Sequence, residues 1–214
     1  MEESLVFLKP DAVLRKSIGA AILQEFLNKK EFSILAFKEI VVSEDLAKKH
    51  YKEHEKKHFF PWLVKAVRAA PVLAMIVQGE IKKIRDFLGA TFVQKAEPQS
   101  IRGKYGIWGG VNSVHASDSV ETGLRELELW KKIANLEKDP DAVKKIKEYI
   151  EKWGSSKENN TLKLRNLCKK LTENPELKNQ VYQDLIPLLK EDCPEANLNA
   201  IQNFAAIIIE NVLL

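Results

Sequence analysis

The first 130 residues alternate between short apolar runs and amphipathic stretches. Residues 5–9 form an apolar run that is followed by Pro10-Asp11, and residues 32–42 are rich in β-branched and aromatic side chains. Residues 72–77 are continuously apolar, which is typical of a strand in the centre of a sheet. Together with residues 111–116, these segments predict four strands.

Helical patterns fill the intervals between these strands. Apolar spacing predicts two helices, and side chains that commonly begin helices predict three more. The two periodic segments are residues 19–30 and 80–88, and the three predicted starts are Ser43, Pro61 and Ser117-Asp118-Ser119, the last leading into a helix that runs to about Trp130.

Residues 91–111 contain one proline and four glycines and are expected to form a long ordered loop. The order of strands and helices around this loop suits a sheet covered by helices on one face. We therefore predict an α/β (α+β) fold, a ferredoxin-like βαββαβ sandwich with a four-stranded antiparallel sheet.

The chain changes character after Trp130. Residues 131–214 contain a single glycine and no strand-like alternation, and residues 204–214 are too apolar to be left in water. We expect two units, a domain over residues 1–131 and an all-helical extension over residues 132–214 of unknown function. Four helix starts are marked at Asp139-Pro140, Asn160-Thr161, Asn174-Pro175 and Asp192-Cys193-Pro194, and Pro187 is expected to kink the third helix.

Composition and charge narrow the function classes. The 34 basic and 30 acidic residues are interleaved along the chain, so no nucleic-acid partner is expected. No apolar run approaches the roughly 20 residues of a membrane span, so no membrane partner is expected either. Cys168 and Cys193 are too few and too far apart for a disulfide framework, and the acidic segment after Met1 does not resemble a secretory signal. We expect a soluble, cytoplasmic protein.

The candidate chemistry centres on His115, which lies at the end of a predicted strand among small polar residues. A neutral imidazole attacks phosphorus well when one ring nitrogen is free and a partner fixes the other. Glu126 lies in the following helix, from which it could face back toward this strand end. Taken alone, the pattern also fits a structural histidine.

Basic and polar residues elsewhere could surround a phosphate. Lys9 ends the first strand, and Arg85 and Arg102 flank the long loop. Thr91 and Asn112 could donate hydrogen bonds. Phosphoryl transfer needs charge neutralisation, usually with a divalent cation, and the chain has no Gly-x-x-x-x-Gly-Lys-Ser/Thr loop to supply it. A phosphate site must therefore be built from side chains, although each basic residue taken singly also fits a solvated surface charge.

A series of motifs follows the pattern of a known family. Lys9-Pro10-Asp11-Ala12-Val13 is similar to its opening Lys-Pro-Asp segment, and residues 112–119 resemble its Asn-x-x-His-Gly-Ser-Asp-Ser signature. Between them, in the family's order and spacing, come His50-Tyr51, Phe59-Phe60-Pro61, Pro71-Val72-Leu73-Ala74-Met75, Leu88-Gly89-Ala90-Thr91 and Ser100-Ile101-Arg102-Gly103. Over about residues 4–130 the chain resembles the nucleoside diphosphate kinase family.

The resemblance implies a ping-pong reaction, in which a nucleoside triphosphate phosphorylates His115 and a nucleoside diphosphate then takes the phosphate. Mg²⁺ would be bound mainly through the nucleotide phosphates, without a metal site of side chains. Ser117 and Glu126 would orient the nucleophile, Lys9 would act with it, and Phe59 would stack on the base. The family also implies a homo-oligomer. The nucleotide-binding residues that the resemblance implies are Lys9, Tyr51, Phe59, Leu63, Arg85, Thr91, Arg102 and Asn112.

Six positions depart from the family pattern, although none removes a group that the transfer chemistry requires. Gly109 stands where a valine commonly packs on the base. The others are Ala116 for glycine, Phe92-Val93 for Asn-Pro, Lys104 for aspartate and His58 for proline.

Two other hypotheses stay open. His54-Glu55-Lys56-Lys57-His58 matches the His-Glu-x-x-His zinc signature, and on a helix His50 would share its face. A solvated helix face explains the same residues. Alternatively, the chain is a catalytically weak, kinase-like nucleotide-binding module whose helical extension binds a protein partner.

Overall fold

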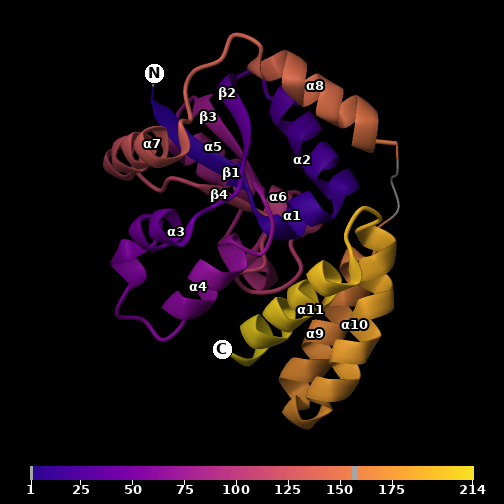
Figure 1. Ribbon diagram of the computed structural model, residues 1–214. Helices are drawn as coiled ribbons and strands as arrows, with labels where there is room; N and C mark the ends of the chain where they lie inside the picture. Colours follow the sequence, from indigo (N-terminus) through magenta and orange to yellow (C-terminus); the bar gives the residue numbers. More distant parts are fainter. Residues whose placement is uncertain (1, 156–158) are drawn as a thin grey trace.

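Four strands form one sheet in the computed structural model of the protein, which describes residues 2–155 and 159–214 (Figure 1). The order is β2-β3-β1-β4, so the apolar run at residues 72–77 lies in a central strand, as predicted. Each neighbouring pair is antiparallel, which confirms the ferredoxin-like sheet. The strands are β1 (Glu3–Leu8), β2 (Ser33–Ile40), β3 (Val72–Gln78) and β4 (Val114–Ala116).

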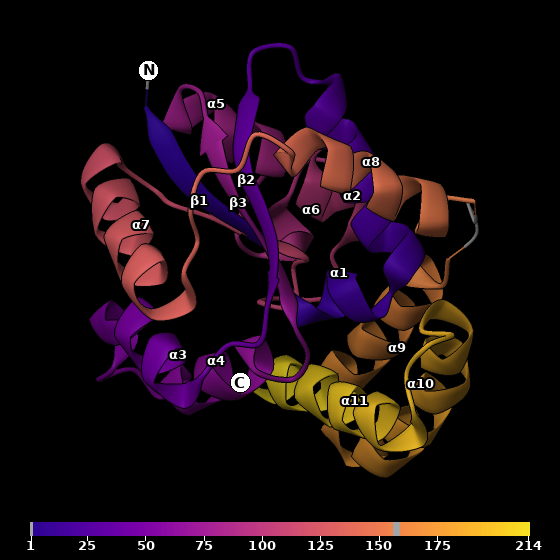
Figure 2. The ribbon, with the colours of Figure 1, turned by 45° about the horizontal axis from the view of Figure 1, so that its top comes forward.

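Helices cover both faces of the sheet, and the expectation of helices on one face only is wrong. Val6 and Leu8 of β1 join the core on one face, against α1, α2, α5, α6 and α8, whereas Leu5 and Phe7 join the core on the other, against α3, α4 and α7 (Figures 1 and 2). A strand buried on both faces reads as a continuous apolar run, as residues 72–77 do, so the sequence already carried a signal for two layers of helices. The helices up to residue 134 are α1 (Pro10–Leu14), α2 (Lys16–Asn28), α3 (Glu44–His50), α4 (Phe60–Val67), α5 (Ile81–Leu88), α6 (Ile101–Tyr105) and α7 (Val120–Ala134).

Local capping chemistry explains which helix starts were predicted well. The Ser43 hydroxyl accepts a hydrogen bond from the backbone N–H of Leu46, and the Ser119 hydroxyl accepts one from Thr122, each at 3.1 Å. The expected loop over residues 91–111 is interrupted by α6, whose cap Ser100 accepts from Gly103 at 3.1 Å. A helix of five residues is too short to show periodicity, so the loop prediction missed it.

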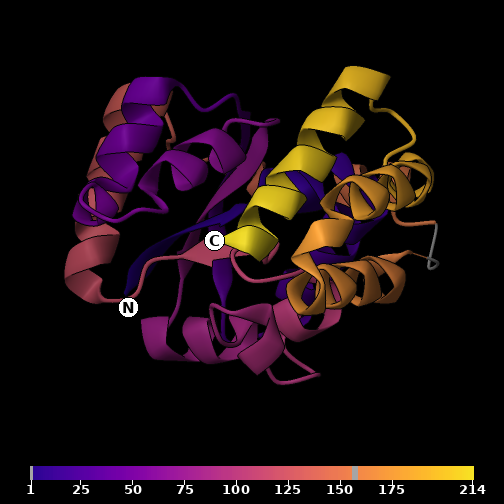
Figure 3. The same cartoon turned by 90° about the horizontal axis from the view of Figure 1, so that it is seen from below.

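The residues after α7 fall into two groups. The expected domain boundary at residue 131 lies inside α7, and α8 (Ala142–Trp153) packs against α2 and β2, with Ile146 in the core of that face. The remaining helices form a bundle (Figure 3), and Trp62, Ile107 and Val111 of the sheet domain join its hydrophobic core. The helices of the bundle are α9 (Thr161–Glu173), α10 (Lys178–Asp192) and α11 (Leu198–Leu213). Among the described residues, no helix is both long and apolar enough to cross a bilayer.

The start of the last helix differs from the prediction. Asp192 still belongs to α10, and the side chain of Asn197 caps α11 by accepting from the N–H of Ala200 at 2.9 Å. The proline at residue 194 therefore lies in the connection between two helices. Pro187 lies inside α10, the helix in which a kink was expected.

A buried ion pair ties the bundle to the sheet domain. Arg15, between α1 and α2, is fully buried and donates from Nε to Asp192 Oδ2 at 2.8 Å. Its Nη2 donates to Thr161 Oγ1 at 2.6 Å, and its Nη1 donates to the carbonyl of Tyr105 at 3.2 Å. Arg165 of α9 donates to the carbonyl of Gly106 at 2.9 Å, just after α6. The extension therefore packs directly on the segment that follows α6.

Candidate active site

His115 lies in β4 with its ring partly open to solvent. Strand pairing places it opposite Phe7 of β1, and the two rings stack at 4.7 Å between centroids. Phe7 in turn stacks on Trp130 of α7 at 4.9 Å. About a fifth of the His115 side chain is exposed, at 18%. One side of the imidazole is therefore fixed by aromatic packing while part of it stays accessible.

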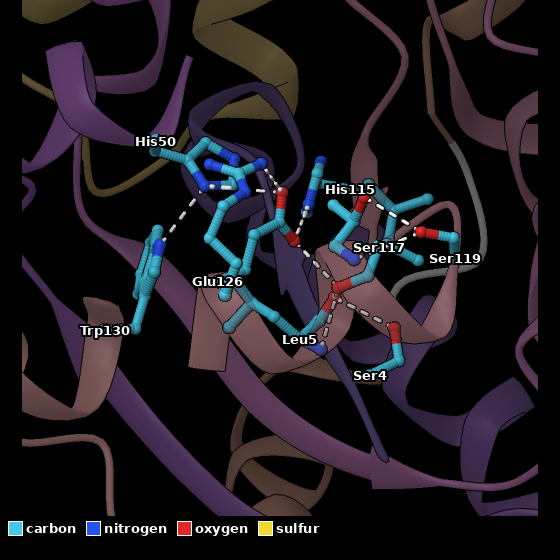
Figure 4. A network of polar contacts seen from close by, with 12 residues as sticks. Ser4, Leu5, His50, His115, Ser117, Ser119, Glu126 and Trp130 are labelled. Carbon is cyan, nitrogen blue, oxygen red and sulfur yellow. Dashed lines mark hydrogen bonds and ion pairs between the residues drawn. The ribbon is translucent and has the colours of Figure 1, made fainter. Parts of the chain in front are cut away.

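Glu126 of α7 faces back to the strand end and fixes one nitrogen of this ring (Figure 4). His115 Nε2 lies 3.0 Å from Glu126 Oε2, and the Ser117 hydroxyl donates to the same oxygen at 2.7 Å. Burial raises the pKa of Glu126, but attraction and hydrogen bonding from His115 outweigh burial and bring that pKa to about 2. A charged carboxylate accepts a hydrogen bond from the Nε2–H, so the proton stays on Nε2 and the lone pair of the ring resides on Nδ1.

His50, at the end of α3, packs against the same carboxylate. Its Nδ1 lies 3.7 Å from Glu126 Oε1 and accepts a hydrogen bond from Trp130 Nε1 at 3.3 Å. Burial, and then repulsion by His115, lower the pKa of His50 to about 3. His50 is therefore neutral at working pH and leaves the negative charge of Glu126 to His115.

The alternative of a zinc site over residues 50–58 requires one continuous helix there, which the structure does not have. Helix α3 ends at His50, a 3₁₀ turn covers Lys52–His54, and turns follow up to the start of α4, so no single helix aligns the histidines. His50 is buried, whereas His58 is exposed. Within the described residues, the group with metal-ligating spacing joins His50 to His115 and Glu126, and it does not include His54 or His58.

Lys9 and Asn112 form a cradle beside the sheet. Lys9 Nζ donates to Asn112 Oδ1 at 2.8 Å and to the carbonyl of Gly110 at 3.3 Å, and Asn112 Nδ2 donates to the carbonyl of Thr91 at 2.7 Å. Burial, followed by repulsion from Arg102, lowers the pKa of Lys9 from 10.5 to about 8. The cluster thus holds a concentrated positive charge suited to an anion.

Arg102 and Arg85 add charge at the same end of the sheet. Arg102 is buried and donates to the carbonyls of Gly89 at 2.8 Å and Val114 at 2.9 Å. Arg85 donates to the carbonyl of Ala116 at 3.2 Å. Burial, followed by repulsion from Arg85, lowers the pKa of Arg102 to about 10, so the Arg102 guanidinium remains charged at neutral pH. Val114 and Ala116, whose carbonyls accept these hydrogen bonds, are the residues on either side of His115 in β4.

The predicted base-binding residues lie on α4 and the turn before it. Phe59 is partly exposed and contacts the rings of His54 and His58, with centroids at 5.6 and 5.4 Å. Leu63 borders a hollow that Lys9 also lines. Tyr51 is buried and packs edge-on against His50 at 4.6 Å. Leu63 and Lys9 therefore share one hollow, while Tyr51 joins the residues around His50.

Asp11 and Ser113 lie inside the family motifs but were not among the predicted site residues. Asp11 is buried and accepts from the Ser113 hydroxyl at 3.1 Å, and burial raises the pKa of that carboxyl. Ser113 has a φ of 71°, a left-handed conformation that is strained for a residue with a side chain. Its carbonyl accepts from the Lys9 N–H at 2.9 Å, so the strained residue links the cradle to the strand of His115.

Comparisons with known proteins show which family this chain matches. A family model described as nucleoside diphosphate kinase matches residues 2–136. A nucleoside diphosphate kinase from Cyanothece sp. is 42% identical over 138 residues, which cover 64% of this chain and 91% of that protein. The solved structure of a halophilic nucleoside diphosphate kinase from Halobacterium salinarum in complex with CDP matches with a TM-score of 0.59 and 36% identity, covering 68% of this chain and 97% of that one. The Aquifex aeolicus nucleoside diphosphate kinase matches with a TM-score of 0.56 and 34% identity, covering 60% and 93%.

Proposed function

The chain belongs to the nucleoside diphosphate kinase family and is a nucleoside diphosphate kinase, and we propose that Nδ1 of His115 carries the phosphate. The main support for this proposal is the 3.0 Å contact between His115 Nε2 and Glu126 Oε2. This contact leaves Nδ1 with the lone pair, and a partly exposed imidazole with one free nitrogen is a competent nucleophile.

The proposed reaction has two half-steps. The Nδ1 lone pair forms a bond to the γ-phosphorus of a nucleoside triphosphate, and the bond to the β–γ bridging oxygen breaks, which releases a nucleoside diphosphate. A terminal oxygen of a second nucleoside diphosphate then attacks the same phosphorus, and the phosphorus–nitrogen bond breaks. Lys9, Arg85 and Arg102 are proposed to neutralise the phosphate oxygens during both steps, because transfer of this kind depends on positioning and charge.

Mg²⁺ is proposed to arrive with the nucleotide. The donors that surround the cradle are cations and amides, and Asp11 is already bonded to Ser113, so the oxygen ligands that Mg²⁺ prefers would come from phosphates. When bound, the ion would neutralise charge on the transferring phosphates. The group of His50, His115 and Glu126 offers nitrogen ligands, which suit Mg²⁺ poorly.

The broader assignments are proposals as well. Homo-oligomerisation is proposed from the family resemblance, and β2 is an edge strand with exposed Val41 just beyond it. A cytoplasmic location is proposed because both cysteines are free and buried, as suits a reducing compartment. The alternative of a weak nucleotide-binding module is disfavoured, since the cradle, His115 and Glu126 are all in place.

The direct test of the proposed function is to incubate the protein with γ-labelled ATP and Mg²⁺. We expect an acid-labile, base-stable label on the protein that is lost when any nucleoside diphosphate is added, with the label recovered as nucleoside triphosphate. Failure to label the protein would remove His115 as the phosphate carrier.

Replacement of Glu126 by glutamine should lower kcat by about 10- to 100-fold with little change in nucleotide affinity, since the carboxylate orients the nucleophile rather than contacting substrate. The amide lacks the charge that stabilises a cationic ring, and its NH₂ group can bond Nε2 and move the proton to Nδ1. Steady-state kinetics would measure the split between kcat and KM. Glu128→Gln, an exposed change on the same helix, is the matched control. An unchanged kcat in Glu126→Gln would contradict this orienting role.

The pKa of Lys9 predicts an alkaline limit to activity. Because burial lowers this pKa to about 8, the charged form is present below that pH and is lost as the pH rises through it. We expect kcat/KM to fall about tenfold per pH unit well above pH 8, while kcat holds to higher pH because bound phosphate restores the charge.

The conservative variant Lys9→Arg should remove this limb, because a guanidinium stays charged. Lys83→Arg, at an exposed position of α5, should leave the limb in place. A limb that persists unchanged in Lys9→Arg would assign the titration to another group.

A further inference from the structure

The last helix of the extension borders the nucleotide site. Trp62 Nε1 donates to the carbonyl of Ile207 at 3.0 Å, and Lys65 pairs with Glu210, so α11 is held against α4 (Figures 2 and 3). Helix α4 carries Leu63 and follows directly after Phe59, the two residues proposed to hold the base. The extension therefore reaches the part of the domain where a nucleotide base would lie.

Asn211 of α11 occupies the space beside a glycine pair in this region. Its Oδ1 accepts a hydrogen bond from the N–H of Gly110 at 3.0 Å. Gly109 has a φ of 49°, and a Cβ built on it would lie 2.6 Å from Asn211 Oδ1. The resemblance puts a base-packing valine at position 109, so the carboxamide of Asn211 stands where that side chain would be.

The same segment leads directly to the phosphate cradle. The carbonyl of Gly110 accepts from Lys9 Nζ at 3.3 Å, while its N–H is bonded to Asn211. A hollow in this region is lined by Lys9, Leu63 and Gly110 together with Phe204 and Ile207 of α11. Helix α11 thus shares a hollow with residues proposed to bind the phosphates and the base.

We propose that Asn211 contacts the nucleotide base on the side opposite Phe59. It binds the base in place of the side chain that Gly109 lacks. This inference rests on the proposed function. The Gly110 N–H engages Oδ1, and Nδ2 has no hydrogen-bond partner among the described residues, so Nδ2 is available as a donor. Ring nitrogens and carbonyls that accept hydrogen bonds occur on every natural base, so such a donor serves purines and pyrimidines alike.

The test compares complete and base-free phosphate donors. Labelling of His115 would be measured with ATP, GTP, CTP and UTP, and with ribose 5-triphosphate, which has no base. For Asn211→Ala we expect kcat/KM to fall about three- to tenfold with each nucleotide, the loss expected for one hydrogen bond. With ribose 5-triphosphate it should stay within about twofold of the wild-type value, since the lost contact is to the base.

Asn211→Asp separates a base contact from a structural role. The aspartate keeps an oxygen for the Gly110 N–H and loses the Nδ2 donor, so it should show the same nucleotide-selective loss as the alanine variant. Any general repulsion of phosphate by its charge would also appear with ribose 5-triphosphate and can be divided out. Gln202→Ala, at an exposed position of the same helix, should match the wild type with all donors.

Each outcome decides the matter. Equal losses with ATP and ribose 5-triphosphate, or wild-type kinetics in both Asn211 variants, would overturn the proposal while leaving the kinase chemistry intact. Faster labelling in Asn211→Ala would overturn it too, because α11 would then cover the site rather than complete it. No label on the wild-type protein from any nucleotide would overturn the proposed function, and this inference with it.

Discussion

His115→Asn is expected to abolish phosphoenzyme formation and to lower nucleoside diphosphate kinase turnover by about 10⁴-fold or more, the order of loss seen when a covalent nucleophile is removed. Asparagine has no nitrogen lone pair that can attack phosphorus. The shorter amide does not reach Glu126, but the Ser117 hydroxyl still donates to that carboxylate at 2.7 Å, so the carboxylate is not left without a partner. The chemistry should therefore fail while the site largely keeps its shape.

Two measurements separate this result from misfolding. Nucleotide affinity, measured by calorimetry, should change by less than about threefold, because the cradle of Lys9 and Asn112 is retained. The melting temperature should fall only modestly, since Phe7 loses one stacked ring but keeps Trp130. His54→Asn, which alters a histidine outside the phosphate site, should label normally. Retention of an acid-labile label in His115→Asn would place the phosphate on another residue.

The parts of the fold that the sequence predicts are those with local signals. Strands β1 and β3 follow from apolar runs, and the starts of α3 and α7 follow from the serines that cap them. Each of these signals lies within a few residues of the structure it sets. The five residues of α6 are too few to show a helical period. The polar connection before α11 is also too short to show one, so the start of that helix was not predicted either.

The candidate site likewise contains residues whose placement follows from local sequence signals and residues whose placement does not. His115 and Lys9 each end or occupy a strand, so their placement at one end of the sheet follows from the strand order. The contact of Asn211 with Gly110 joins residues 101 positions apart, and that of Arg15 with Asp192 joins residues 177 apart. No spacing rule within one chain indicates such pairs. They depend on how the bundle of α9, α10 and α11 docks, which the apolar character of residues 204–214 predicted only as a need to pack somewhere.

Truncation tests how much the C-terminal helices contribute to stability. Chains that end at residue 131 and at residue 155 should behave differently. A chain that ends at residue 131 loses the last turn of α7, the buried Leu136 and all of α8, whose Ile146 belongs to the core under the sheet. Loss of the buried Leu136 and Ile146 costs about 2–5 kcal/mol each, which together is comparable with the 5–15 kcal/mol that commonly holds a domain folded. We expect this shorter chain to be insoluble.

A chain that ends at residue 155 keeps α8 but still loses the bundle. Trp62, Ile107 and Val111 would be exposed, because their apolar partners are on α9, α10 and α11. Arg15 would lose Asp192 and Thr161 and keep its hydrogen bond to the carbonyl of Tyr105. Loss of one partner of a buried ion pair costs about 3–5 kcal/mol when the charge stays buried, and exposure of the region to water lessens that cost. We expect a folded but aggregation-prone protein with a clearly lower melting temperature.

The measurement is the soluble fraction and the thermal midpoint of both chains, followed by labelling with ATP and Mg²⁺. A chain that ends at residue 212 is the matched control, since Leu213 and Leu214 are exposed, and it should match the full-length protein in stability. Labelling of the 155-residue chain should persist, because His115, Glu126 and Lys9 remain, but with the weaker nucleotide binding expected when Asn211 is gone. A fully stable, monodisperse 131-residue chain would instead mean that α8 and the bundle serve a role apart from the kinase fold.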